Sequence, residues 1–146
     1  MIEHLLHPAA DDAVSYILRH DHHATHWPGQ SAEEHIIWQI KAGQYFIARK
    51  GGAIAGYLRF CRFWTMPYIE LIRVEPEWRG QQIGRQLVSA LMDMARQEGS
   101  TYLLSSSQSN EPEAQAFHKA VGFVDMGRLS GLNDDGSDEV MFRLDL

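Results

Sequence analysis

The sequence of 146 residues contains a single cysteine, Cys61, and few prolines. One cysteine cannot form an internal disulfide, so a reducing, cytoplasmic location is expected. Long apolar runs are also absent, because no segment approaches the ~20 apolar residues that a membrane-spanning helix needs. The acidic N-terminal stretch MIEHLLHPAADD has no basic region before an apolar run. We therefore expect neither a signal peptide nor a membrane partner.

Basic residues are fewer than acidic ones: 13 Lys and Arg stand against 19 Asp and Glu, giving a formal net charge of −6. Phosphate binding by nucleic-acid-binding proteins draws on clustered basic residues, so nucleic acid is not an expected partner. An acidic balance is compatible with a cationic small substrate such as an amine, although many proteins are acidic for solubility alone. Internal repeats and long linkers are absent as well, and residues 1–146 are predicted to form one domain.

Hydrophobic periodicity predicts helices and strands in the order β-α-α-β-β-β-α-β-α-β-β. The N-terminal half begins with a strand at 2–6 and a helix at 9–19. A second helix follows the capping-box residues Ser31 and Glu34. Strands are predicted at 45–48, 53–63 and 68–74, with a chain break at Pro67 before the last of them. The C-terminal half contains a helix from Ile83, a strand at 102–105, a helix at 112–121 and a hairpin of 123–132 with 139–144. This order predicts a mixed sheet with helices on both faces.

The segment VEPEWRGQQIGRQLV, residues 74–88, joins a strand to a helix through a glycine-containing turn. The first N–H groups of a helix lack intrahelical partners and the helix dipole is positive there, so such a turn suits an anion. Arg79 and Arg85 add charge beside it. The alternative is an ordinary strand–turn–helix in which Gly84 only permits close packing. Neither G-x-x-x-x-G-K-[ST] nor a dinucleotide-binding G-x-G-x-x-G occurs, which excludes the P-loop and the dinucleotide fold.

The pattern V-x-P-x-x-R-G-x-x-I-G-x-x-L of residues 74–87 resembles the acetyl-CoA pyrophosphate motif of the GNAT superfamily of N-acetyltransferases. A second segment, NEPEAQAFHKAVGF from Asn110 to Phe123, is similar to that superfamily's second signature. The distance between the two segments accommodates one helix and one strand, as the superfamily fold requires. The predicted topology also matches along nearly the full chain.

The resemblance implies an α/β (α+β) fold with a mixed, mostly antiparallel β-sheet flanked by helices on both faces. It implies an acyl-CoA-dependent N-acyltransferase that moves an acetyl group from acetyl-CoA to a primary amine of a small molecule or peptide, without a metal. A homodimer is one expected state, since dimers are frequent in the superfamily. The alternative function is a catalytically silent acyl-CoA-binding or sensory domain of the same fold, with a nucleic-acid binder more distant.

The resemblance also assigns cofactor-binding positions. Backbone N–H groups of the strand before the motif would bind the pantetheine arm and the thioester carbonyl, at Ile72, Arg73 and Val74. The motif loop would hold the pyrophosphate, at Arg79, Gly80, Gln81, Gln82, Ile83, Gly84 and Arg85, and Asn110 of the second signature joins this set. Where the family pattern often has glycine this chain has Gln82, which is tolerated if it lies in the first helical turn with negative φ.

Two residues are candidates for the catalytic chemistry. His118 stands where the family usually has a tyrosine that protonates the departing CoA thiolate; a histidine with a pKa near ~6.5 donates when protonated or through its neutral N–H. The alternative is a helix surface residue. Glu70 resembles the position of a general base, which matters because neutralising an amine with a pKa near ~10 at pH 7 costs about 4 kcal/mol. The alternative is that Glu70 lies on a solvated face.

The histidine-rich segment HDHHATH, residues 20–26, suggests a metal site because His22 and His26 are separated by one helical turn. Structural zinc sites have more strictly spaced Cys and His ligands, so no metal site is predicted. The resemblance places this region at the border of the acceptor pocket, which makes Trp27, Glu33 and Trp38 candidate substrate-binding residues. A solvated polar loop is the alternative.

Overall fold

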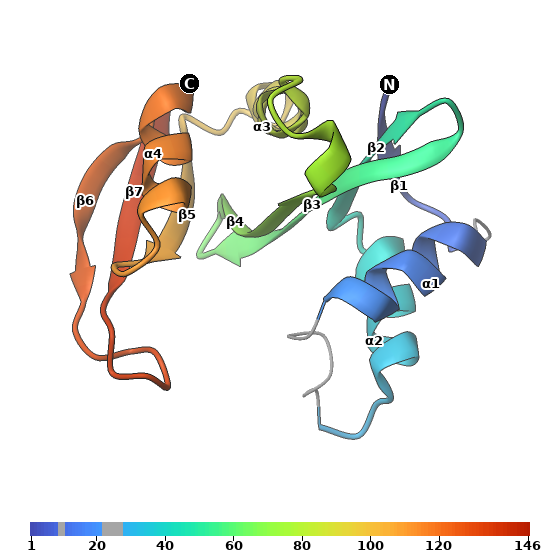
Figure 1. The fold of residues 1–146 in the computed structure, drawn as a ribbon, viewed down its shortest axis with the longest axis horizontal. Helices are drawn as coiled ribbons and strands as arrows, with labels where there is room; N and C mark the ends of the chain where they lie inside the picture. Colours follow the sequence, from blue (N-terminus) through green and yellow to red (C-terminus); the bar gives the residue numbers. More distant parts are fainter. Residues whose placement is uncertain (9–10, 22–27) are drawn as a thin grey trace. The chain divides into compact units, whose positions relative to one another are not determined.

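The structure is a computed structural model that describes residues 1–8, 11–21 and 28–146. Its elements, drawn in Figure 1, are β1 (Ile2–Leu5), α1 (Asp11–His20), α2 (Ala32–Lys41), β2 (Tyr45–Lys50), β3 (Ala53–Phe63), β4 (Met66–Val74), the 3-10 turn η2 (Pro76–Trp78), α3 (Ile83–Gln97), β5 (Tyr102–Gln108), α4 (Pro112–Val121), β6 (Val124–Leu129) and β7 (Glu139–Asp145). Apart from η2, this is the order predicted from periodicity.

The strands are hydrogen-bonded in the order β1-β2-β3-β4-β5-β7-β6. The pairs β1–β2, β2–β3, β5–β7 and β6–β7 are antiparallel, whereas β4–β5 is parallel. Helix α3 connects β4 to β5, because two parallel neighbours need a crossover connection. The predicted mixed, mostly antiparallel sheet is therefore confirmed.

The chain divides into two compact units, each made of two segments. Unit 1 comprises Met1–Arg59 and Ile72–Leu87, and unit 2 comprises Phe60–Leu71 and Val88–Leu146. The single domain of residues 1–146 stays a prediction. None of the helices in the described part of the chain is long and apolar enough to cross a membrane.

In unit 1, apolar residues of α1 and α2 share a core with β2, and Ile17, Ile36 and Ile47 have no exposed surface. Helix α2 begins with the predicted capping box: Glu34 N–H donates to Ser31 Oγ at 3.2 Å and Ser31 N–H donates to Glu34 Oε2 at 3.1 Å. Both bonds satisfy N–H groups that the helix itself leaves without partners. The start of α2 is thus determined by a local signal.

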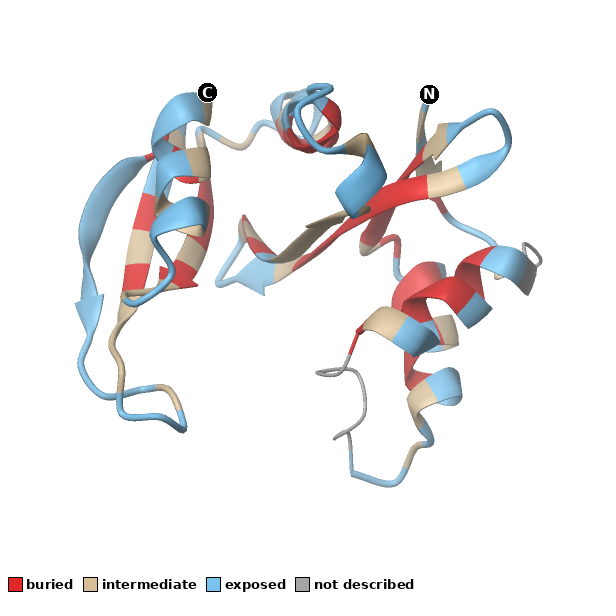
Figure 2. Cartoon of the chain, in the orientation of Figure 1, coloured by how far each residue is buried: buried red, intermediate tan, exposed pale blue. Residues whose placement is uncertain are grey.

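In unit 2, α4 packs against β5 and β7. The ring of His118 stacks on Phe142 of β7 with centroids 4.4 Å apart. Helix α4 ends at Gly122, whose φ of 115° is left-handed and whose N–H donates to His118 O. Strand β6 is exposed along its whole length, while β7 beside it carries buried residues, as Figure 2 shows.

The break predicted at Pro67 is wrong, because Pro67 is the second residue of β4. Proline is tolerated near the start of a strand, where its missing N–H removes little of the ladder. The chain instead reverses at the preceding residues, where Trp64 has a φ of 55°. Strand β5 also extends beyond the predicted end, to Gln108.

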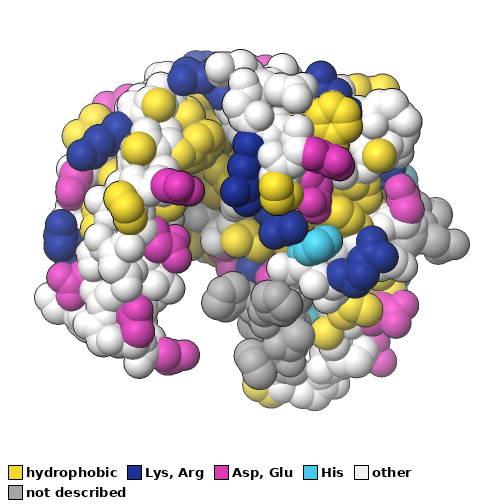
Figure 3. Space-filling view, in the orientation of Figure 1, with side chains coloured by type: hydrophobic (Ala, Val, Ile, Leu, Met, Phe, Trp, Pro, Cys, Tyr) yellow, Lys and Arg dark blue, Asp and Glu magenta, His cyan; other side chains and the backbone are white. Residues whose placement is uncertain are grey.

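Side chains of both charge signs cover the surface. On the face seen in Figure 3, Lys and Arg side chains lie beside Asp and Glu side chains. Several ion pairs join such side chains, for example Arg49 with Asp12 at 2.7 Å in unit 1 and Arg62 with Glu98 at 2.7 Å in unit 2. Basic residues on this face are therefore largely interspersed with acidic ones.

Candidate functional site

The loop between β4 and α3 has an unusual backbone. Gly80 has a φ of 77° and Gln82 a φ of 67°, whereas Arg79 has a φ of −67°. Gln81 is not among the residues with positive φ, so the sign alternates along the loop. An anion-binding nest of successive N–H groups has a residue of negative φ followed by one of positive φ, an order that Gln81 and Gln82 have, whereas Arg79 before Gly80 is extended with a ψ of 152°.

The expectation that Gln82 has helical φ and ψ is wrong. Helix α3 begins at Ile83, and Gln82 precedes it in the left-handed region, with its carbonyl accepting from Gln86 N–H at 2.9 Å. A non-glycine residue there costs about 1–2 kcal/mol. Within the described residues, only Trp64 shares this property with Gln82. Such strain persists where the surroundings demand it, and it is concentrated at functional sites.

Two basic residues belong to this loop and the first turn of α3. Arg79 and Arg85 are exposed, and Arg79 Nε donates to Val74 O at 3.2 Å, which holds the guanidinium over the start of the loop. The first turn of α3 contains no acidic residue that would oppose an anion. Gly80 is open to solvent, since a Cβ built on it meets no atom within 4 Å. The loop can therefore accept a phosphate group from the solvent side.

The strand that leads into the loop is held close to β3. A Cβ added to Gly56 would lie 2.4 Å from Arg73 O, so only glycine permits the observed approach of the two backbones. Ile72, Arg73 and Val74 are partly exposed at this end of β4. Gly56 was not predicted as part of the site, although an isolated glycine in a strand is a known signal of close backbone approach.

A polar cluster that was not predicted adjoins the loop. The hydroxyl of Tyr16 donates to Glu75 Oε1, His20 Nε2 lies 3.7 Å from that oxygen, and Arg73 Nη2 lies 3.4 Å from it. The hydrogen bond from Tyr16, together with the positive charge of Arg73, lowers the pKa of the Glu75 carboxyl. Burial, and then the bond to Glu75, raises the pKa of Tyr16 to about 12. The only sequence signal was the one-turn spacing of Tyr16 and His20 on α1.

His118 is buried, with 6% of its surface exposed, so the alternative of a helix surface residue is wrong. Its Nδ1 lies 2.6 Å from Ala114 O and its Nε2 lies 2.7 Å from Ser105 Oγ. A carbonyl oxygen can only accept, so Nδ1 carries the hydrogen and Nε2 of the neutral ring accepts from the serine hydroxyl. Burial lowers the pKa of His118, which favours this neutral form.

The remaining predicted residues belong to both units. In unit 2, Glu70 is exposed on β4, and Asn110 Nδ2 donates to Asp135 Oδ2 at 3.0 Å. In unit 1, Glu33 is exposed on α2, and Trp38 is half exposed with its ring stacked on His35 at 5.9 Å. Trp27, His22 and His26 lie outside the described residues. Over the described ranges there is no group of three or more His, Cys, Asp or Glu residues placed to hold a metal ion.

Comparisons with known proteins show which family has sequences like this one. The sequence matches the model of the acetyltransferase (GNAT) family over residues 12–123. It is 34% identical over 106 residues to the N-alpha-acetyltransferase RimI of Mycobacterium tuberculosis, covering 69% of this chain and 65% of that protein. It is 34% identical over 62 residues to the aminoglycoside N(6')-acetyltransferase type 1 of Stenotrophomonas maltophilia, covering 42% of this chain and 40% of that protein. The matches thus span less than two thirds of the length of these two relatives.

Solved structures agree on the fold. The ribosomal-protein-S18-alanine N-acetyltransferase from Escherichia coli has a TM-score of 0.74 to this structure at 21% identity. That match covers 99% of this chain and 92% of the other. At this identity the likeness concerns the fold alone.

Proposed function

This chain belongs to the acetyltransferase (GNAT) family, and we propose that it moves an acetyl group from acetyl-CoA to a primary amine of a small molecule or peptide. The observation that carries the proposal is the loop of residues 79–85, whose alternating φ values, positive helix end and two arginines suit a pyrophosphate. Relatives named for an N-alpha amine and for an aminoglycoside amine support acceptors of this kind.

The acyl end of acetyl-CoA supplies the activated thioester, and this chain supplies its binding and orientation. Backbone N–H groups of Ile72, Arg73 and Val74 are the proposed partners of the pantetheine arm. The N–H of Ile72 or Val74 is also the proposed donor to the oxyanion that develops as the amine attacks the carbonyl. The close approach of β3 at Gly56 holds this stretch of backbone in position.

The acceptor must be neutral to attack, and its deprotonation at pH 7 costs about 4 kcal/mol. Glu70 is the proposed base, acting directly or through water, because its carboxylate is exposed on β4. A cationic acceptor also suits the net charge of −6. Glu33 and Trp38 on α2, with Trp27, remain the proposed acceptor contacts.

His118 is the proposed acid for the departing thiolate. Because both of its ring nitrogens have protein partners, this role requires His118 to exchange its contact with Ser105 or with Ala114. A thiol pKa near ~8.5 makes CoA a good leaving group in any case. Turnover is therefore expected to depend on His118 less strongly than on the loop.

Calorimetry and a thiol assay test the proposal. Acetyl-CoA at about 100 times its Kd should stabilise the protein by about 2.7 kcal/mol, which a thermal shift detects. Pantetheine, which lacks the pyrophosphate, is the matched control ligand and should stabilise far less. A panel of small amines and peptides should then include acceptors that release free CoA.

Two results decide against the enzyme. An absence of acetyl-CoA binding at millimolar ligand overturns the proposal completely. Binding without CoA release across the panel favours the second candidate, a catalytically silent acyl-CoA-binding or sensory domain. The observation that favours this candidate is the burial of His118 with both ring nitrogens in contact with protein atoms, which lowers its pKa and leaves it no free nitrogen for the thiolate.

A further inference from the structure

We infer that α1 positions the pyrophosphate loop through Glu75, with Tyr16 and His20 as positioning residues. The inference rests on the proposed function, because it assigns these residues to the binding of acetyl-CoA. Glu75 stands between Val74, the last residue of β4, and Pro76, the first residue of η2. It is therefore the point at which the strand passes into the loop.

The backbone of Glu75 is held on both sides. Its N–H donates to Ala55 O of β3 at 2.8 Å, and its carbonyl accepts from Trp78 N–H at 2.9 Å. The next bond along the chain joins Arg79 N–H to Pro76 O at 3.3 Å. If the backbone of Glu75 moves, η2 moves with it, and the change reaches Gly80 and Gln82, the two loop positions with positive φ.

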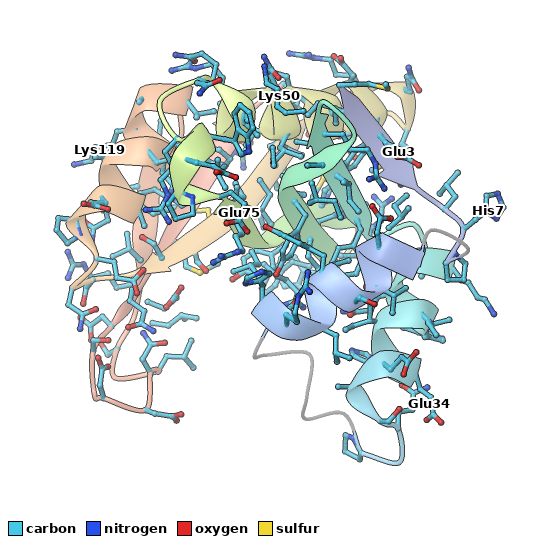
Figure 4. The ribbon with its side chains drawn as sticks, turned by 45° about the vertical axis from the view of Figure 1, so that its right-hand side comes forward. Glu3, His7, Glu34, Lys50, Glu75 and Lys119 are labelled. Carbon is cyan, nitrogen blue, oxygen red and sulfur yellow. The ribbon has the colours of Figure 1, made fainter. Side chains whose placement is uncertain are left out.

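The side chain of Glu75 is held from α1. Tyr16 is buried and its hydroxyl donates to the carboxylate, and His20 stands one turn further along the same helix. The ring centroids of Tyr16 and His20 are 4.6 Å apart and the rings are tilted by 50°, so the two side chains contact each other beside Glu75. Figure 4 labels Glu75, whose side chain lies beside α1.

The contacts of the Glu75 carboxylate are strong enough to fix the position of Glu75. Hydrogen bonds to an ionised group are shorter and about twice as strong as those between neutral groups. The Glu75 side chain has only 20% of its surface exposed, so its contacts are less screened than those of surface ion pairs. The loop N–H groups need a particular orientation to bind an anion. Because Glu75 is fixed at the start of the loop, the loop loses less conformational entropy when it binds the anion.

Tyr16→Phe removes the hydroxyl and keeps the ring, so it tests the contact with little change in packing. We expect the Kd for CoA, measured by calorimetry, to rise about fivefold or more, in the range of measured coupling between sites. Without ligand, hydrogen exchange at the backbone amides of residues 79–84 should become faster. Glu75→Gln, which keeps the shape and removes the charge, should act in the same direction.

Asp12→Asn is the matched control. It loosens α1 elsewhere, because Asp12 pairs with Arg49 of β2 at 2.7 Å and 3.2 Å. It should leave both CoA binding and exchange of the loop amides unchanged. A loss of affinity in both variants would mean that any loosening of α1 matters, which overturns the inference.

The inference is also overturned if Tyr16→Phe binds CoA as tightly as the native chain and the loop amides exchange at the native rate. If the native chain binds no CoA, the proposed function fails. In that case the exchange measurement on the free protein still decides whether Tyr16 positions the loop. The failures of the two proposals are therefore distinguishable.

Discussion

Gly80→Ala is a direct perturbation of the proposed pyrophosphate loop. Gly80 has a φ of 77°, and an added Cβ would meet no atom within 4 Å. The substitution thus introduces no clash, and its effect comes from backbone conformation alone. Alanine disfavours the left-handed region, so the free loop is expected to relax toward negative φ, which reorients the adjoining N–H groups.

The expected changes in stability and in affinity follow from the positive φ and the open surroundings of Gly80. Holding an alanine in the left-handed region costs about 1–2 kcal/mol. Part of this cost is offset in folding, because alanine restricts the unfolded chain and thereby contributes about 0.4–1 kcal/mol. The free energy of unfolding should therefore fall by less than about 1.6 kcal/mol. Binding must restore the left-handed geometry, so the Kd for acetyl-CoA should rise by about fivefold to thirtyfold at 1.4 kcal/mol per factor of ten.

The assay is isothermal titration with acetyl-CoA beside urea unfolding of the free protein. Gly51→Ala is the matched control: Gly51 lies in the same unit, has a φ of 56° and has nothing within 4 Å of an added Cβ. It should lose a similar amount of stability and bind acetyl-CoA with native affinity. The reasoning is refuted if Gly80→Ala binds normally, or if Gly51→Ala weakens binding equally.

Three further predictions concern His118 and Gln82. His118→Gln removes a stacked ring and at least one hydrogen bond, so urea unfolding should show a loss of about 2–4 kcal/mol. Burial lowers the folded pKa of His118 below its usual 6.5, so the native chain should lose stability as pH falls below about 6.5. An equal pH slope in the variant would contradict this origin. Gln82→Gly relieves about 1–2 kcal/mol of strain and adds about 0.5–1 kcal/mol of chain entropy cost, so the free energy of unfolding should rise slightly with acetyl-CoA affinity retained. A marked loss of stability would show that the Gln82 side chain makes a necessary contact.

Local signals predicted the order of the elements correctly, apart from η2. The capping box of Ser31 and Glu34 marks the start of α2, and Gly122 ends α4 in the left-handed conformation. These signals involve residues within one turn of each other, and the backbone alone dictates what they need. The two family motifs belong to the same category, because each is a continuous stretch of chain. The family and the mixed sheet followed from them.

The conformation of Gln82 was not predictable from local propensity. Glutamine favours helices, and a helix does begin at the next residue. The position of that first turn depends on how the loop leaves β4, which the packing of β3 and the turn η2 determine. Tertiary contacts therefore override the preference of a single residue by about 1–2 kcal/mol.

The sequence by itself determined the order of elements, the family and the loop that is proposed to hold acetyl-CoA, because each depends on residues that are neighbours along the chain. The tertiary structure alone decided that Tyr16 contacts Glu75 across 59 positions, and that His118 is a buried neutral ring bonded to Ser105. Both facts depend on which elements pack together. Burial and hydrogen-bond partners arise from that packing, and no spacing in the sequence encodes them.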